Sequence, residues 1–160
     1  MTNPAPMKHP TDRQNARTLG WYIRMALCVL LAIFYGYAGY AHIAAPASFL
    51  AITPDWVPFK EAVIYWTGIA EIAGAIALIQ PFSAPLRKAG GIGLALYAVC
   101  VWPANINHMM MDAQTVGWTM SEGAGLAYHI PRMIAQPVFI WLALWVSGAT
   151  DWPFKRRGTA

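Results

Sequence analysis

The sequence predicts an all-α membrane protein, a bundle of four transmembrane helices with both termini in the cytoplasm. Hydrophobic residues make up 58% of the 160 residues and charged residues only 11%, whereas a soluble domain carries about 25% charged residues. Eight tryptophans and seven tyrosines suit the interfaces of a bilayer, which favour amphipathic rings. Several apolar runs approach the roughly 20 residues that a spanning helix needs. Because lipid offers the backbone no hydrogen-bond partners, runs of this length without alternation are expected to be helices.

The predicted helices follow these apolar runs in chain order. They are Trp21–Ala41, Ala62–Ile79, Ala89–Ala104 and Met133–Ala149. The third run is slightly shorter than a span, so its helix is expected to extend into Leu86–Lys88 or Asn105–Asn107. Small residues four positions apart let helix backbones approach closely in lipid. Such pairs predict close packing at Ala32/Gly36, Ala70/Gly74 and Ala89/Gly93.

The connections between the helices are predicted from their composition. The loop after the first helix carries Pro46, Pro54 and Pro58 among apolar and turn residues, so we expect it to lie against the periplasmic face of the membrane. The stretch WPANINHMMMD, Trp102–Asp112, follows an apolar run and is interpreted as the point where the third helix leaves the membrane on the outer side, with Trp102 at the interface. Pro103 weakens the preceding turn and frees a carbonyl group. A longer outer segment would then lead to the fourth helix.

A single membrane domain with two polar ends is predicted. Residues 1–18 form a cytoplasmic lead that is expected to be disordered, because prolines and polar residues dominate its start. Residues 19–150 form the four-helix membrane domain, and residues 151–160 form a basic cytoplasmic tail.

Basic residues predict the orientation. Only Lys60 and Arg132 fall on one side of a four-pass topology. The other side holds Lys8, Arg13, Arg17, Arg24, Arg87, Lys88, Lys155, Arg156 and Arg157. Because loops rich in Lys and Arg stay in the cytoplasm, both termini and the 80–88 loop are predicted to be cytoplasmic, in a bacterial-type inner membrane. The basic residues therefore indicate a lipid bilayer as the partner of these charges, and not a nucleic acid.

Glu71 is the first candidate for a functional residue. It lies near the middle of the second predicted helix, where an acidic side chain costs on the order of 2.5–3.5 kcal/mol to insert. Thr67, Gly68 and Gly74 share its helix face, and such small or polar neighbours indicate that the face points into the bundle. Ionisable groups within a membrane are functional candidates by default. A structural carboxyl group, hydrogen-bonded across the bundle, is the alternative.

Further polar residues are expected at a similar depth near the periplasmic ends of the helices. They are His42, Asn105, His108, His129, Arg132 and Gln136. Arg132 departs from the charge bias, which predicts that it pairs with the buried acid Glu71. A pocket formed by these side chains could hold the polar head group of a quinone. An interhelical hydrogen-bond network, with no ligand, is the other interpretation.

Metal and haem binding are less favoured by the pattern. Met109, Met110 and Met111 beside His108 and Asp112 suggest copper, because thioether is a soft ligand. Three consecutive methionines, however, cannot all face one ion on a helix. A haem would need two of His42, His108 and His129 on opposite faces of its ring, and nothing in the sequence places them so. No metal ligands are therefore assigned.

The order of several motifs resembles the DoxX-like family of small four-helix membrane proteins. The motifs are GYAGYAHIAAPASFLAITPDWVP, TGIAEIAGAIALI, WPAN and PRMIAQP, and the match covers roughly residues 34–145. The matching positions are His42, Pro46, Phe49, Pro54, Pro58, Gly68, Glu71, Pro103, Ala104, Asn105, Arg132 and Gln136. The resemblance implies a four-helix bundle in the cytoplasmic membrane. It also implies an association with redox systems, since the namesake subunits accompany a thiosulfate:quinone oxidoreductase.

Different classes of function stay open at this point. The leading hypothesis is a redox-associated membrane subunit that binds a quinone or another small ligand, with a redox protein or a second copy of the chain as candidate partner. The alternatives are a non-catalytic accessory or assembly protein and a small transporter with Glu71 as its proton site. No nucleophile–base pair, flavin motif or nucleotide-binding loop is recognisable in the sequence. Whether the protein is an enzyme is therefore left open.

Overall fold

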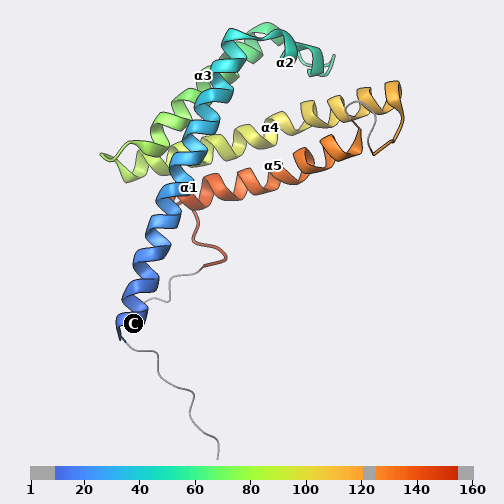
Figure 1. The fold of residues 1–160 in the computed structure, drawn as a ribbon. Coiled ribbons are helices and arrows are strands. Elements are labelled where there is room, and N and C mark those ends of the chain that lie inside the picture. Colours follow the sequence, from blue (N-terminus) through green and yellow to red (C-terminus); the bar gives the residue numbers. More distant parts are fainter. Residues whose placement is uncertain (1–9, 121–124, 155–160) are drawn as a thin grey trace, which may run out of the picture.

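The computed structural model describes residues 10–120 and 125–154, and all regular secondary structure in these ranges is helical, with no strand in either of them (Figure 1). Its helices are α1 (Pro10–Ala44), α2 (Ala47–Ile52), α3 (Lys60–Ile79), α4 (Ala84–Val116) and α5 (Leu126–Ser147). Four of them are long and apolar enough to cross a membrane, with residues 19–44 as the apolar part of α1. The predicted multi-pass helical architecture is thus confirmed, and α2 adds a short helix within the proline-containing loop.

The bounds of α4 differ from the prediction. The helix starts at Ala84, where the Ser83 hydroxyl accepts a hydrogen bond from the Leu86 amide, and it continues through Pro103 to Val116. At about 1.5 Å per residue it is roughly 50 Å long, which exceeds the hydrocarbon thickness of about 30 Å. The helix therefore extends beyond both predicted flanks, Leu86–Lys88 and Asn105–Asn107, whereas the departure from the membrane within Trp102–Asp112 stays a prediction. Packing along α5 supports the helix where the proline removes a hydrogen bond.

The ends of α1 and α5 also lie outside the apolar runs that predicted them. α5 begins at Leu126, so that Pro131 and Pro137 lie inside it. It ends at Ser147 and is capped by Gly148, which has a positive φ of 83°. α1 begins at Pro10 and therefore includes the second half of the predicted polar lead. Residues 1–9 of that lead and residues 155–160 of the basic tail lie outside the described residues.

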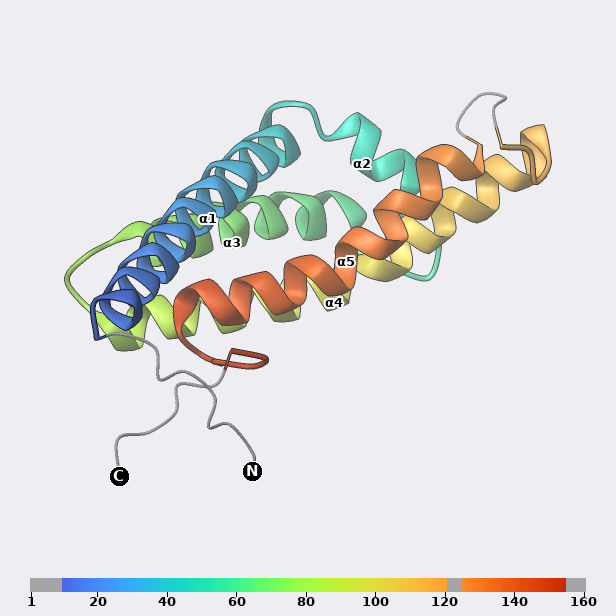
Figure 2. The same ribbon diagram turned by 60° about the horizontal axis from the view of Figure 1, so that its bottom comes forward.

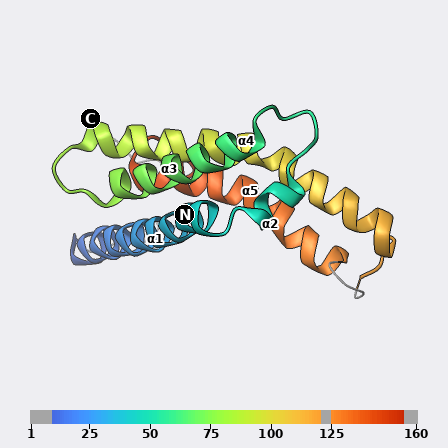
Figure 3. The same cartoon turned by 90° about the horizontal axis from the view of Figure 1, so that it is seen from above.

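The long helices pack as two pairs. α1 lies along α3 and α4 lies along α5, while α3 also packs on α4 (Figure 2). The two pairs diverge toward the end of the molecule that carries α2 (Figure 1). We call this the α2 half, and we call the end that contains residues 80–83 the opposite half. α2 packs against both α3 and α4, and viewed from above it lies over the α4–α5 pair (Figure 3).

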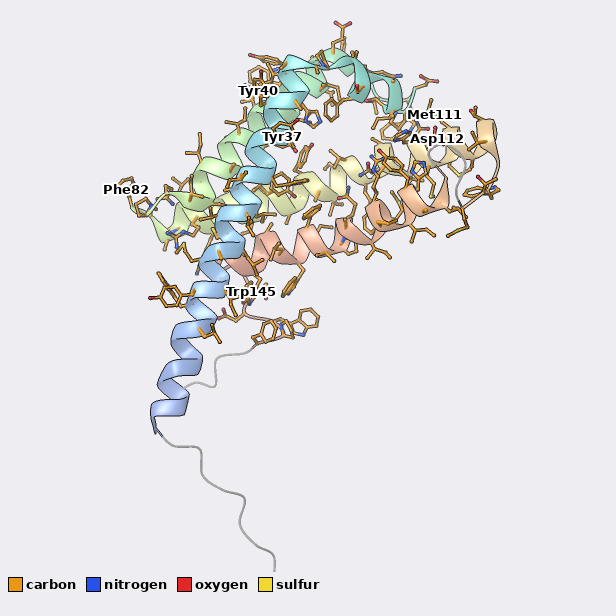
Figure 4. The ribbon with its side chains drawn as sticks, viewed as in Figure 1. Tyr37, Tyr40, Phe82, Met111, Asp112 and Trp145 are labelled. Carbon is orange, nitrogen blue, oxygen red and sulfur yellow. The ribbon has the colours of Figure 1, made fainter. Side chains whose placement is uncertain are left out.

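The hydrophobic core fills the opposite half. It consists of Cys28, Leu31, Ala32, Tyr35, Ala75, Leu78, Leu94, Ala95, Ala143 and Val146. Arg24 joins α1 to the end of α5, because its guanidinium lies 5.3 Å from the centre of the Trp145 ring and donates to the Trp145 carbonyl. Trp145 is labelled in Figure 4. The outside of α1 is apolar, with Leu30, Ile33 and Tyr37 all exposed, as contact with a lipid bilayer requires.

Glycines permit the closest helix contacts, but not always the predicted ones. A Cβ atom on Gly74 would lie 2.6 Å from the Leu94 side chain, and one on Gly91 would lie 2.1 Å from the Ser147 hydroxyl. A Cβ atom on Gly93 would meet nothing within 4 Å. The prediction of close packing at Gly93 was therefore wrong, because α4 turns Gly90 and Gly91, and not Gly93, toward its neighbours.

Candidate functional site

A cavity of about 470 Å³ occupies the α2 half, between the diverging helix pairs. Its walls come from all the long helices, and α2 with residues 53–57 adds to its lining. The divergence explains the cavity, because the glycines that bring α3 against α4, Gly74 and Gly90, lie in the opposite half. The lining is mostly apolar and carries a few polar side chains, which is the usual composition of a small-molecule site.

Aromatic rings form the floor of the cavity, toward the core of the opposite half. Phe34 of α1 stacks on Phe139 of α5 with 4.7 Å between ring centres. The Tyr35 ring meets the edge of Phe139 at 6.3 Å and that of Tyr97 at 6.2 Å. This floor offers flat apolar surface to a ring-shaped ligand.

Glu71 and His42 form a buried pair in the α1–α3 wall. They are 2% and 7% exposed, respectively. Nδ1 of His42 lies 2.8 Å from Oε2 of Glu71 and 2.9 Å from the carbonyl oxygen of Ala38, and the imidazole stacks on Phe49. Glu71 thus faces the interior and contacts His42, as predicted.

The hydrogen on this histidine follows from its neighbours. A backbone carbonyl can only accept, so Nδ1 of His42 carries the hydrogen and donates it. One N–H group then serves two acceptors, and the better-directed hydrogen bond goes to Ala38. Oε2 of Glu71 has no other hydrogen-bond partner among the described residues. Oε2 of this buried carboxylate therefore has only a shared hydrogen bond from the protein, so it can still accept a hydrogen bond from a ligand.

Arg132 occupies the opposing α4–α5 wall. It donates to Nδ1 of His108 at 2.7 Å and to Oδ1 of Asn105, and its guanidinium lies 5.0 Å from the centre of the Tyr128 ring. The described residues contain no ion pair between Arg132 and Glu71, so the predicted pairing was wrong. Arg132 instead meets His108 and Asn105 on α4, while Glu71 meets His42 on α1.

The predicted site residues fall into two groups. Those that line the cavity are His42, Glu71, Asn105, Arg132 and Gln136. Gln136 is buried and lies one turn beyond Arg132 on α5, so the two side chains share one face of that helix. His108 and His129 do not line the cavity.

The two remaining histidines meet Asp112 in a second cluster. Nε2 of His108 lies 3.1 Å and Nε2 of His129 lies 2.9 Å from the same Oδ2 atom of Asp112. Asp112 was absent from the predicted site. On a helix that continues past residue 107, His108 and Asp112 are four positions apart and lie on one face, and this spacing would have indicated Asp112. Arg132 connects this cluster to the cavity, because it contacts His108 and lines the cavity.

Comparison with known proteins places the chain in a family defined by its sequence. No curated protein and no solved structure matches it significantly. Residues 31–147 match the family described as Domain of unknown function (DUF8561). The matched segment runs from within α1 to the end of α5 and so contains both the cavity and the histidine–aspartate cluster. Since the match covers most of the chain, the protein belongs to the DUF8561 family.

Proposed function

We propose that the protein binds a small amphipathic molecule of the quinone class in the cavity of the α2 half. The observation that carries this proposal is the cavity itself, which combines apolar walls with polar side chains on two opposing sides. Its volume of about 470 Å³ falls within the range of roughly 300–1,000 Å³ that is common for small-molecule sites.

The polar side chains complement a quinone head group in both redox states. Arg132 and Gln136 on α5 can donate hydrogen bonds to a ring carbonyl. Glu71, whose Oε2 atom is only partly satisfied, can accept from a hydroxyl group of the reduced ring. The aromatic floor supports stacking of the ring, and the apolar walls suit its tail. One ligand could thus contact both helix pairs.

The biological setting we propose is a redox-associated subunit of a bacterial-type inner membrane. The excess of basic residues at the opposite half supports an orientation in which that half is cytoplasmic and the cavity lies toward the periplasm. The resemblance to the DoxX-like family supports a role beside a redox protein. Such a partner would supply the two electrons that reduce the bound quinone, or take them from the bound quinol. A second copy of the chain is the alternative partner, and it would add no redox group.

A thermal-shift experiment tests the binding proposal. A fully substituted short-chain benzoquinone is added to the purified protein in detergent, and a rise in Tm is expected that saturates with concentration. Glu71→Gln and Arg132→Ala should each reduce this rise, because each removes a polar contact to the head group. Glu61→Gln is the matched control, since Glu61 is exposed in the first turn of the same helix as Glu71. An equal shift in all variants would contradict the proposal.

The buried Glu71–His42 pair also favours a second candidate function, a small proton-linked transporter. In that case Glu71 would exchange a proton with the cavity while a substrate crosses. Proteoliposomes that hold a pH-sensitive dye would acidify or alkalise when substrate is added, and Glu71→Gln would abolish the change. If neither a quinone nor a coupled proton movement is found, the polar residues only hold the helices and the protein is a non-catalytic accessory protein.

A further inference from the structure

We propose that His108, Asp112 and His129 bind a divalent transition metal ion of the zinc class. His108 and Asp112 lie one turn apart on α4, and His129 comes from the first turn of α5. Each offers one ligand atom, and these atoms all lie within 4.8 Å of one another. The site is separate from the cavity, so this proposal does not depend on quinone binding.

The spacing of the ligand atoms suits such an ion. Around a tetrahedral zinc ion with bonds of about 2.0–2.1 Å, neighbouring ligand atoms are roughly 3.3–3.4 Å apart. The two Nε2 atoms lie 3.1 Å and 2.9 Å from Oδ2 of Asp112. These two nitrogen–oxygen separations therefore need to grow by only a few tenths of an ångström to match a shared zinc ion, and the two Nε2 atoms lie within 4.8 Å of each other.

The donor set selects the chemical class of the ion. Two imidazoles and one carboxylate suit zinc and its neighbours in the first transition row, and do not need a soft sulfur ligand. Met110 and Met111 do not provide the thioether ligands of a copper site here. Sδ of Met111 accepts a hydrogen bond from Asn107, and Met110 is exposed.

Burial divides the ligands into one fixed and two accessible groups. His129 is only 1% exposed. Its Nε2 contacts Asp112, and its Nδ1 has no hydrogen-bond partner among the described residues. His108 and Asp112 are partly exposed near the far end of α4, where Figure 4 labels Asp112. The buried ligand gives the site a rigid base. The exposed side leaves coordination positions for water or another exchangeable ligand.

Arg132 links the metal site to the cavity. A guanidinium group can only donate, so Nδ1 of His108 accepts from Arg132, and the hydrogen of the neutral ring is on Nε2, facing Asp112. A metal ion at Nε2 of the neutral ring requires the other tautomer, so the hydrogen leaves Nε2 and Nδ1 takes up a proton in its place. Arg132 must then release His108 and turn to Asn105 and the cavity. Metal binding is therefore expected to be weakened by Arg132.

Titration with Co²⁺ tests the proposal on the full-length protein in detergent, after removal of any affinity tag. We expect one Co²⁺ per chain, with visible d–d absorption that Zn²⁺ removes by displacement. Asp112→Asn should weaken binding by at least about tenfold. Asp55→Asn should leave binding unchanged, because Asp55 is an exposed acid that pairs with Lys60 elsewhere in the molecule. Met111→Leu should also leave it unchanged.

Arg132→Gln gives the most specific result. It removes a positive charge and supplies a carbonyl oxygen that can accept from a protonated Nδ1 of His108, so we expect Co²⁺ to bind about tenfold more tightly. His129→Ala should abolish binding. Because His129 is buried, the result for His129→Ala counts only if its Tm and elution profile show a folded protein. If the variant does not fold, the result for Asp112→Asn decides whether the proposal stands. Binding that is absent from the parent protein, or that Asp112→Asn does not weaken, would overturn the proposal.

Discussion

Gly39 of α1 and Gly68 of α3 face each other so closely that a Cβ atom on Gly39 would lie 2.5 Å from the Gly68 carbonyl oxygen. In the other direction, a Cβ atom on Gly68 would lie 2.8 Å from the Gly39 carbonyl oxygen and 2.9 Å from Cβ of His42. Only glycine allows the two backbones to approach this far. The glycine contact lies next to the His42–Glu71 pair. It holds α1 and α3 close enough for Nδ1 of His42 to lie 2.8 Å from Oε2 of Glu71.

The first prediction concerns this contact. Gly68→Ala should lower the free energy of unfolding by about 1–3 kcal/mol, the usual cost of overpacking, because the backbone of α1 must move away. The movement should also separate His42 from Glu71 and reduce quinone binding. SDS titration followed by circular dichroism measures the stability. Gly93→Ala is the matched control, since a Cβ atom there meets nothing within 4 Å. Equal stability of the two variants would refute the close contact.

The second prediction concerns the energetic coupling of the buried pair. His42→Gln and Glu71→Gln should each destabilise the protein, because each leaves the partner's polar group less satisfied. Their effects should not add, and a double-mutant cycle should give a coupling energy of about 0.5–3 kcal/mol. The same cycle with Glu61→Gln in place of Glu71→Gln should give additive effects. Additivity in both cycles would show that the pair does not interact.

The third prediction uses the two cysteines, which are both free. Cys100 is exposed and lines the cavity, whereas Cys28 is 4% exposed in the core. A small maleimide should therefore modify one thiol in the folded protein and both in SDS, as counted by mass spectrometry. A bound, fully substituted benzoquinone should slow the modification of Cys100. Equal reactivity of the two thiols in the folded protein would contradict the packing of α1 against α3.

The fourth prediction concerns orientation. Reporter domains fused after Ser83 and at the C-terminus should report the cytoplasm, because most basic residues lie at that end. A reporter inserted at Gly117, just after α4, should report the periplasm. A periplasmic signal at the C-terminus would reverse the proposed position of the cavity.

Much of the fold is predictable because the lipid environment leaves few alternatives. Apolar runs near Trp21, Ala62 and Ala89 predict helices, since lipid cannot satisfy any other backbone conformation. The ends of α4 and α5 are not predictable in this way. Their last and first turns are polar or contain proline, and contacts between α4 and α5 hold them helical.

The candidate site is predictable for isolated side chains but not for their partners. The cost of burying Glu71 and its small neighbours indicated an interior position, which the structure confirms at 2% exposure. The partner of Arg132 could not be predicted from charge alone. The partner of Arg132 depends on how far the helix pairs diverge. In the structure its guanidinium lies 2.7 Å from Nδ1 of His108, whereas Glu71 lies in the opposite wall of the cavity.

Photoaffinity labelling with an azido-benzoquinone tests the central claim most directly. After irradiation, the modified residues are located by mass spectrometry with and without an excess of unlabelled benzoquinone. Binding in the cavity predicts modification that is competed away and lies on cavity-lining segments, such as residues 34–42 of α1 and 132–139 of α5. Modification confined to lipid-facing positions such as Leu30 and Ile33, with no competition, would contradict the proposed site.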